Sequence, residues 1–339
     1  MRRRQFFFAL TTTHPPTLPS PEEIALQAGA DIAAVPAPQA DTLFAERALR
    51  LRELAAGHAM RDYLLLLALV SEAQHERARR YPQVRLPDAA QIDASAATGQ
   101  PLLAATAWPR EPLWRTELRA LLAQVLQQLP GDSPARATVQ AVIGLPDQAL
   151  EQQADRLLAG ITLGLDMAAA PLIAAGLQLY WAHLVAGTAS AHPGLWRHLE
   201  SRGTCPCCGS LPTSSIRRVG PGMKGQRYLH CTLCQTEWHM VQVMCTHCLG
   251  TQGIHYQALQ ALAAAAPTSE RAAVEAETCD HCHHYLKLLH MEREPHADPV
   301  ADDLATLTLD LLVSDAGFTR HGTNLLLLFG DAEAPPGER

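Results

Sequence analysis

Eight cysteines, arranged as four pairs, are the residues best able to do chemistry in this chain of 339 residues. Each pair has the spacing C-x-x-C, and the pairs are Cys205 and Cys208, Cys231 and Cys234, Cys245 and Cys248, and Cys279 and Cys282. Two intervening residues allow both sulfurs of a pair to face one ion, and two such turns complete a tetrahedral site with four thiolates. The spacing therefore predicts two metal sites.

The spacers between the pairs indicate which pairs share an ion. They run over residues 209–230, 235–244 and 249–278. The short middle spacer favours sequential pairing, in which the first two pairs hold one ion and the last two pairs hold the other. An interleaved arrangement stays open because both long spacers exceed the usual zinc-ribbon length. Four sulfur ligands suit both zinc and iron, so the residues alone leave the metal open.

The cysteine-rich segment fits a disulfide framework or a redox dithiol less well than it fits metal sites. Adjacent pairs make poor disulfide partners, and a redox dithiol needs one C-x-x-C pair rather than four. Cys207 is the ninth cysteine, and we interpret it as a free thiol. Nearby histidines are interpreted as neighbours of the sites or as surface residues because eight cysteines already fill two sites; they are His230, His239, His247, His281, His283 and His284.

The segment before the cysteines has the apolar periodicity of helices. The first helix begins at Asp41 or Thr42 and ends at Gly57, and a second runs on to Arg80. Further helices are expected over residues 117–129, 133–143, 146–165 and 167–185, the last as a buried core helix, with a short one at Ser20 and a long loop over 82–112. No catalytic constellation is visible there. We therefore expect an all-α domain over residues 1–196.

Residues 197–339 are expected to form a metal-binding domain with two tandem ribbon-like modules, which makes the fold class α+β. Strands are predicted over residues 228–231 and 237–245. An amphipathic helix follows over 298–312, with Asp302 and Asp303 as capping acids, and residues 324–329 form a short strand or docking segment. Because metal would tie only the small module, loss of Cys231 and Cys234 is expected to leave the helical domain formed.

Composition narrows the class of protein. The net charge of -7 and the pI near 6.1 argue against a dedicated nucleic-acid binder. The apolar stretch after Arg4 is too short for an export signal, and no apolar run reaches membrane-spanning length, so we expect a cytoplasmic protein without a membrane span.

Two alternative functions stay open. One is a zinc-ribbon protein that binds nucleic acid through Arg217, Arg218, Lys224 and Arg227, and the other is a thiol redox protein.

Several segments together resemble the formate dehydrogenase accessory protein FdhE family. They include LQLYW at 177–181, TEWH at 236–239 and ADDLAT at 301–306, together with residues 43–58, 205–210, 227–234, 275–282 and 285–287. The resemblance covers nearly the whole chain from about residue 40. It departs from the family at Gln242 and Met244, where relatives tend to carry basic residues, and at the extra Cys207.

The resemblance implies a non-enzymatic assembly factor of the cytoplasm. It implies a helical N-terminal domain and two rubredoxin-like modules, each binding one iron ion through four cysteines. The implied partner is the catalytic subunit of a respiratory formate dehydrogenase, whose maturation depends on such proteins; nucleic acid is not expected, and a homodimer is left open. We expect the client to bind a face that includes Trp238, Tyr285 and the helix from Asp302.

Overall fold

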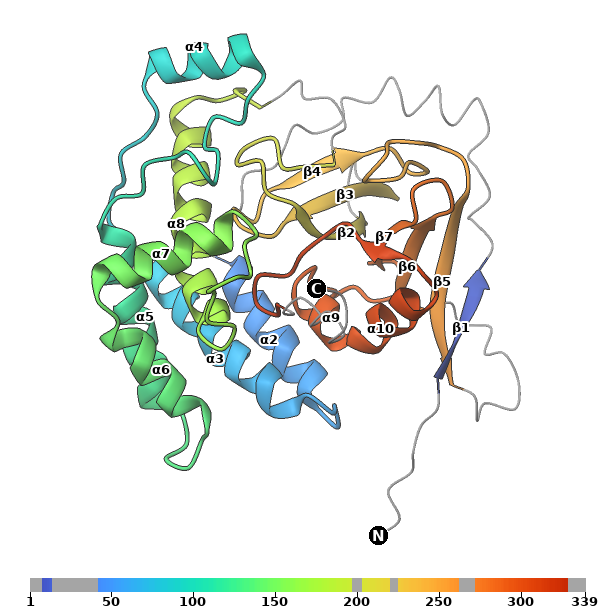
Figure 1. Ribbon diagram of the computed structural model, residues 1–339, viewed down its shortest axis with the longest axis horizontal. Helices are drawn as coiled ribbons and strands as arrows, with labels where there is room; N and C mark the ends of the chain where they lie inside the picture. Colours follow the sequence, from blue (N-terminus) through green and yellow to red (C-terminus); the bar gives the residue numbers. More distant parts are fainter. Residues whose placement is uncertain (1–7, 14–41, 197–202, 220–224, 262–271, 329–339) are drawn as a thin grey trace, which may run out of the picture.

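The computed structural model describes residues 8–13, 42–196, 203–219, 225–261 and 272–328, so the short helix predicted at Ser20 lies outside the described residues. The helices are α2 (Leu43–Ala55), α3 (Arg61–Ala78), α4 (Ala89–Thr98), α5 (Leu113–Gln128), α6 (Ala135–Gly144), α7 (Asp147–Leu158), α8 (Ala170–Ala191), α9 (Ala301–Ala305) and α10 (Leu307–Asp315). Helices α2 to α8 lie on one side of the molecule, and a sheet lies on the other with α10 against it (Figure 1).

Helix α8 is the centre of the helical region. Its apolar side chains face α3, α5, α6 and α7, so it is buried on nearly all sides. Gly176 permits a close approach, since a Cβ there would lie 2.9 Å from a methyl carbon of Leu118 on α5. The prediction of a buried core helix is confirmed, and the surrounding helices form where the apolar periodicity predicted them, with ends shifted by a few residues.

Two helical predictions differ from the structure. Residues 82–112 were predicted as a loop but contain α4, whose residues are all outside the core. Asp88 and Gln91 form a reciprocal capping box at its start, and Gly99 closes it with a left-handed φ of 67°. The helix predicted to reach residue 165 ends at Leu158, because Gly160 also adopts a positive φ.

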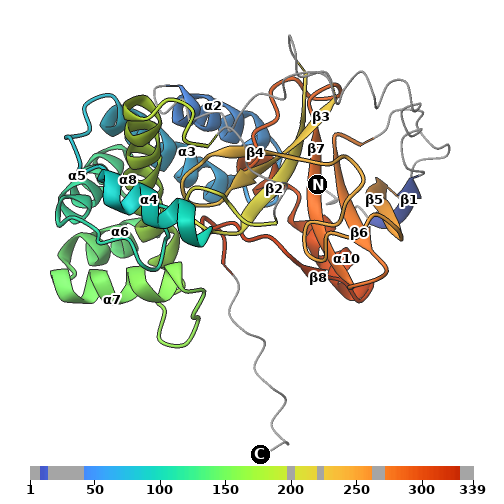
Figure 2. The same ribbon diagram turned by 90° about the horizontal axis from the view of Figure 1, so that it is seen from above.

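One eight-stranded sheet carries both cysteine modules. In spatial order, the main path is β1 (Phe8–Thr13), β5 (Ile254–Ala261), β6 (Val274–Cys279), β7 (His284–His290), β2 (Pro212–Arg218), β3 (Gln226–Cys231) and β4 (Glu237–Met240), and β8 (Thr319–Arg320) pairs with β7. The parallel pairing of β2 with β7 joins the sheet of the first module to that of the second. Viewed from above, the continuous sheet lies beside the helices (Figure 2).

The predicted C-terminal helix is broken into α9 and α10 at Thr306. The Thr306 hydroxyl donates to the carbonyl of Asp302 at 2.8 Å, and the buried Lys287 ammonium donates to the carbonyl of Asp303 at 2.7 Å. These bonds occupy carbonyls near the junction of the two helices. Residues 324–328, the described part of the predicted segment 324–329, form a docking segment with a single isolated bridge between Asn324 and Leu327 and no strand. The Tyr63 hydroxyl donates to the carbonyl of Leu326.

The main hydrophobic core extends from the helices into the first cysteine module. It includes Trp114 and Trp181 from the helical region together with Cys205, Cys208 and Leu229. The second module has a smaller core, made of Cys245, Ile254, Tyr256, Cys279 and Leu288. Because the main core crosses residue 196, the division into domains at that position stays a prediction.

Candidate metal centres

The four C-x-x-C pairs come together in the sequential arrangement. The sulfurs of Cys205, Cys208, Cys231 and Cys234 lie within 4.8 Å of one another, and so do those of Cys245, Cys248, Cys279 and Cys282. We call these the first cluster and the second cluster. The structure does not show the interleaved arrangement that the spacer lengths left open.

The distances between sulfurs suit a tetrahedral ion. Cys205 and Cys234 are 3.5 Å apart at their sulfurs, Cys208 and Cys231 are 3.4 Å apart, and the second cluster has separations of 3.5 and 3.8 Å. A tetrahedron with metal–sulfur bonds of about 2.3 Å has edges of about 3.8 Å. The donor set and its spacing therefore fit one ion of zinc or iron in each cluster.

The same backbone turn presents the sulfurs in all four pairs. The residue after each second cysteine has a positive φ, and these residues are Gly209, Gln235, Leu249 and His283. Three of them are not glycine, so the left-handed conformation costs roughly 1–2 kcal/mol each. Backbone N–H groups of Leu233 and Cys234 lie 3.4 Å from the Cys231 sulfur, as does that of His247 from Cys245. These N–H groups stabilise thiolates.

The environment of the thiols also favours a cation. Burial raises the pKa of Cys205 and Cys231 well above its usual value. Burial also opposes ionisation of Cys234, but hydrogen bonds from the neighbouring thiols outweigh it and lower the pKa of Cys234 well below the usual value. Burial therefore opposes ionisation of these sulfurs in the absence of a cation. A cation that replaces the remaining protons would allow all four to ionise.

Three segments of the helical region hold the first cluster. Arg47 on α2 donates to the side-chain oxygen of Gln235 at 2.8 Å, and Gln178 on α8 donates to the carbonyl of Thr232 at 2.9 Å. The backbone N–H of Leu103 donates to the carbonyl of Cys207 at 3.0 Å. Sequence reasoning did not assign these positioning residues. A polar Gln178 inside a long apolar helix was the available signal.

Arg227 connects the two clusters. It lies on β3, four residues before Cys231, and its Nη2 pairs with an oxygen of Glu277, two residues before Cys279, at 2.8 Å. Its Nη1 also donates to the carbonyl of Met244 at 3.0 Å, directly before Cys245. Both side chains are buried, at 0% and 3% exposure. One guanidinium therefore fixes backbone or side chains beside ligands of both clusters.

Two predictions about other residues are wrong in part. Trp238 and Tyr285 are 2% and 3% exposed, and Asp302 is also buried, so these three side chains do not form a client-binding face. The part of that face assigned to the rest of the C-terminal helix stays a prediction, since Leu311 on α10 is exposed. Asp302 and Asp303 were predicted as caps. Asp302 accepts from the backbone N–H of Asp298 at 2.8 Å, as a capping acid does, and it also pairs with Arg50. Asp303 instead pairs with Lys287 and Arg320, and Asp298 accepts the N–H groups of Val300 and Ala301.

The basic loop does not form a cationic surface in the part of the chain that is described. Arg218 pairs with Glu237 and Arg227 with Glu277, so their charges are neutralised inside the protein. Lys224 lies outside the described residues. These ion pairs neutralise two of the four charges on which the nucleic-acid alternative rested.

Cys207 and the histidines near the clusters lie in different environments. Cys207 is fully buried beside the sulfurs of Cys205 and Cys234, and it lies outside both four-sulfur groups. His230 is buried, and desolvation lowers the pKa of its imidazole to about 4, which keeps it neutral near pH 7. His247 and His284 lie against the second cluster, where their rings stack 3.6 Å apart.

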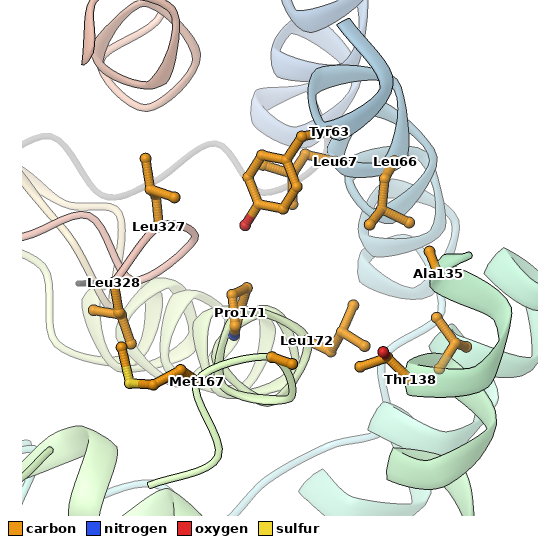
Figure 3. Close-up of a pocket in the computed structure, with 12 residues that line it drawn as sticks. Tyr63, Leu66, Leu67, Ala135, Thr138, Met167, Pro171, Leu172, Leu327 and Leu328 are labelled. Carbon is orange, nitrogen blue, oxygen red and sulfur yellow. The ribbon is translucent and has the colours of Figure 1, made fainter. Parts of the chain in front are cut away.

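An apolar pocket of about 300 Å³ lies between α3, α6, the start of α8 and the docking segment. Tyr63 and Leu66 lie on one side, Met167, Pro171 and Leu172 on another, and Leu327 and Leu328 close a third (Figure 3). Among the residues that line it, only the tyrosine hydroxyl is titratable, and that hydroxyl donates to Leu326. The pocket is apolar and carries no acid–base pair among its lining side chains.

Helix α8 is long and apolar enough to cross a membrane, as judged by length and composition alone. Of its most apolar stretch, 78% is buried inside the protein. A core helix of a globular protein meets the same criterion, and burial of this extent agrees with the core position of α8.

Comparison with known proteins identifies relatives over most of the chain. Three family models match, described as "FdhE, N-terminal" over residues 32–192, "FdhE, central domain" over 204–242 and "FdhE, C-terminal domain" over 243–327. A protein FdhE homolog of Cronobacter sakazakii is 39% identical and protein FdhE of Salmonella dublin is 38% identical, each over 299 residues that cover 87% of this chain and 91% of the relative.

A solved structure agrees with these sequence matches. The crystal structure of the FdhE protein from Pseudomonas aeruginosa superimposes with a TM-score of 0.76 at 35% identity, covering 90% of this chain and all of that one. Sequence identity and fold therefore lead to the same assignment, and the chain belongs to the FdhE family.

Proposed function

We propose that this protein binds two metal ions through its eight paired cysteines and serves as a maturation factor for the catalytic subunit of a formate dehydrogenase. The grouping of the sulfurs into two tetrahedral sets carries the metal-binding part of the proposal. Family membership supports the accessory role. Iron is the metal that the family resemblance implies, and zinc fits the same donors.

The coordination supports a role other than catalysis by the ions. A catalytic metal site keeps a position open for water or substrate, whereas four thiolates fill a tetrahedral ion. Each ion would instead hold two turns of the chain together. We propose that the protein works as a binding protein of the cytoplasm, the compartment in which thiols remain reduced.

A client-capture experiment tests the accessory role. The catalytic subunit is co-expressed with the tagged wild-type chain, with a variant that replaces all eight paired cysteines by serine, and with Cys207→Ala as the matched control. We expect the wild type and Cys207→Ala to retain the subunit and the eight-serine variant to lose it. Equal recovery of the subunit by all three would contradict the proposal.

The folding of each variant must be measured before the recovery of the catalytic subunit is compared between them. Circular dichroism of each purified variant reports the helical content, and a variant that retains only one cluster, such as Cys248→Ser/Cys282→Ser, shows whether a single ion is sufficient. Client recovery by a folded variant that lacks both ions would also overturn the role assigned to the metal.

A further inference from the structure

A second set of metal-binding atoms lies on the solvent side of the second cluster. Ligand atoms of His247, His284 and Cys282 all lie within 4.8 Å of one another. Cys282 also belongs to the second cluster, so the two sets share one sulfur. Imidazole nitrogen and thiolate sulfur together suit zinc, cobalt and iron.

His284 is oriented in the way that metal-binding histidines usually are. Its Nδ1 lies 2.7 Å from the carbonyl oxygen of Cys282. A carbonyl can only accept, so Nδ1 carries the proton and Nε2 keeps its lone pair. A hydrogen bond from the second ring nitrogen to a backbone carbonyl fixes the tautomer and orientation of ligating imidazoles.

His247 completes the set from the neighbouring turn. Its ring stacks on that of His284 with centroids 3.6 Å apart and planes 6° from parallel. The ring of His321 lies edge-on to that of His247 with centroids 5.3 Å apart, and its Nε2 lies 3.1 Å from the carbonyl oxygen of Gly203. His247 is exposed. A shared ion requires one of the two parallel rings to tilt, because parallel rings do not aim their lone pairs at one point.

Exposure distinguishes this edge of the second cluster from the first cluster. Cys248 and Cys282 are half-buried, whereas all four cysteines of the first cluster are buried. An ion arriving from solution can therefore reach Cys282 before it reaches Cys245 or Cys279. His247 and His284 lie beside Cys282, where the ion would arrive.

We propose that His247, His284 and Cys282 capture a divalent cation from solution and transfer it to the second cluster. This inference rests on the proposed binding of an ion by that cluster. The captured ion is bonded to two imidazole nitrogens and the Cys282 sulfur. As the sulfurs of Cys245, Cys248 and Cys279 bond to the ion, the two nitrogen–metal bonds break and thiol protons leave to solvent. The metal keeps its oxidation state throughout.

The rate of metal loading tests this transfer. Metal-free protein is mixed rapidly with Co²⁺, and the thiolate-to-cobalt absorption is followed with time. The phase that belongs to the second cluster is identified as the one missing in Cys248→Ser/Cys282→Ser. We expect His247→Ala/His284→Ala to slow that phase by about tenfold or more, since capture makes later bonds intramolecular. This double variant should still reach two cobalt ions per chain.

His281→Ala is the matched control, because His281 is exposed in the same turn and lies outside the three-ligand group. It should load at the wild-type rate. Equal loading rates in His247→Ala/His284→Ala and the wild type would overturn the inference. A final content of one ion per chain in that double variant would also overturn it, because the histidines would then be permanent ligands. Absence of thiolate absorption from wild-type protein would instead contradict the proposed metal binding itself.

Discussion

The two clusters share one geometry but have different surroundings. The first cluster lies in the main core, among aromatic and aliphatic side chains of the helices, and all of its sulfurs are buried. The second cluster packs against a small core on strands β5, β6 and β7, and two of its cysteines are half-buried. The same ligand set can therefore serve to join two regions of a protein or to stabilise one small module.

The surroundings also determine what removal of an ion should do. Arg47 on α2 and Gln178 on α8 bond to Gln235 and Thr232, which lie beside the ligands Cys234 and Cys231, so loss of the first ion would disturb the helical region as well. The second cluster is fixed mainly by its own strands and by Arg227. We expect the first ion to support the whole fold and the second to support a local unit.

The largest effect is expected from Cys231→Ser/Cys234→Ser. Binding of a structural ion to four cysteines contributes roughly 10 kcal/mol in small modules, which is comparable to the whole stability of a typical domain. Because the first cluster lies in the shared core, this variant should lose protection of α8 against hydrogen exchange. This replaces the expectation from sequence that the helical domain would stay formed.

Cys279→Ser/Cys282→Ser is the matched variant for the second cluster. It should lose protection in β5, β6 and β7 while α8 remains protected. Hydrogen exchange measured by mass spectrometry on both variants gives the comparison directly. If α8 exchanged as slowly in Cys231→Ser/Cys234→Ser as in the wild type, the two clusters would not differ in this way.

A smaller loss of stability is expected from Arg227→Met. It removes the guanidinium that pairs with the buried Glu277 carboxylate, and breaking a buried ion pair costs about 3–5 kcal/mol. The double variant Arg227→Met/Glu277→Met removes both charges and should recover much of that loss. Urea unfolding measures both values. A single variant within about 1 kcal/mol of wild type would show that this pair does not stabilise the fold.

The difference in exposure also predicts a difference in metal release. With a coloured chelator in excess, the second cluster should release its ion at least about tenfold faster than the first, a difference of about 1.4 kcal/mol in activation free energy. Release should then show two phases of equal amplitude, and Cys248→Ser/Cys282→Ser should show the slow phase alone. A single phase that accounts for both ions would contradict the difference.

Local patterns in the sequence were sufficient for much of this architecture. Apolar periodicity located most of the helices, and C-x-x-C spacing grouped the cysteines as the structure does. Helix α4 was missed because it has no buried face, although its Asp88 and Gln91 capping box and its Gly99 were readable signals.

Contacts between distant segments could not be predicted from the sequence. The parallel pairing of β2 with β7 joins strands about 70 residues apart, for which no local signal exists. The same is true of the ion pair between Arg47 and Asp298. Buried aromatic residues such as Trp238 were assigned to a surface because residue type alone does not distinguish a core side chain from an interface one.

The most direct test of two four-sulfur sites is metal analysis combined with X-ray absorption on the purified wild-type protein and on Cys248→Ser/Cys282→Ser. The wild type should contain two ions per chain, each bonded to four sulfurs at about 2.3 Å. The variant should keep one ion with the same four-sulfur shell, since its first cluster is intact. A wild-type content of one ion, or nitrogen and oxygen ligands in the fully loaded protein, would contradict the account.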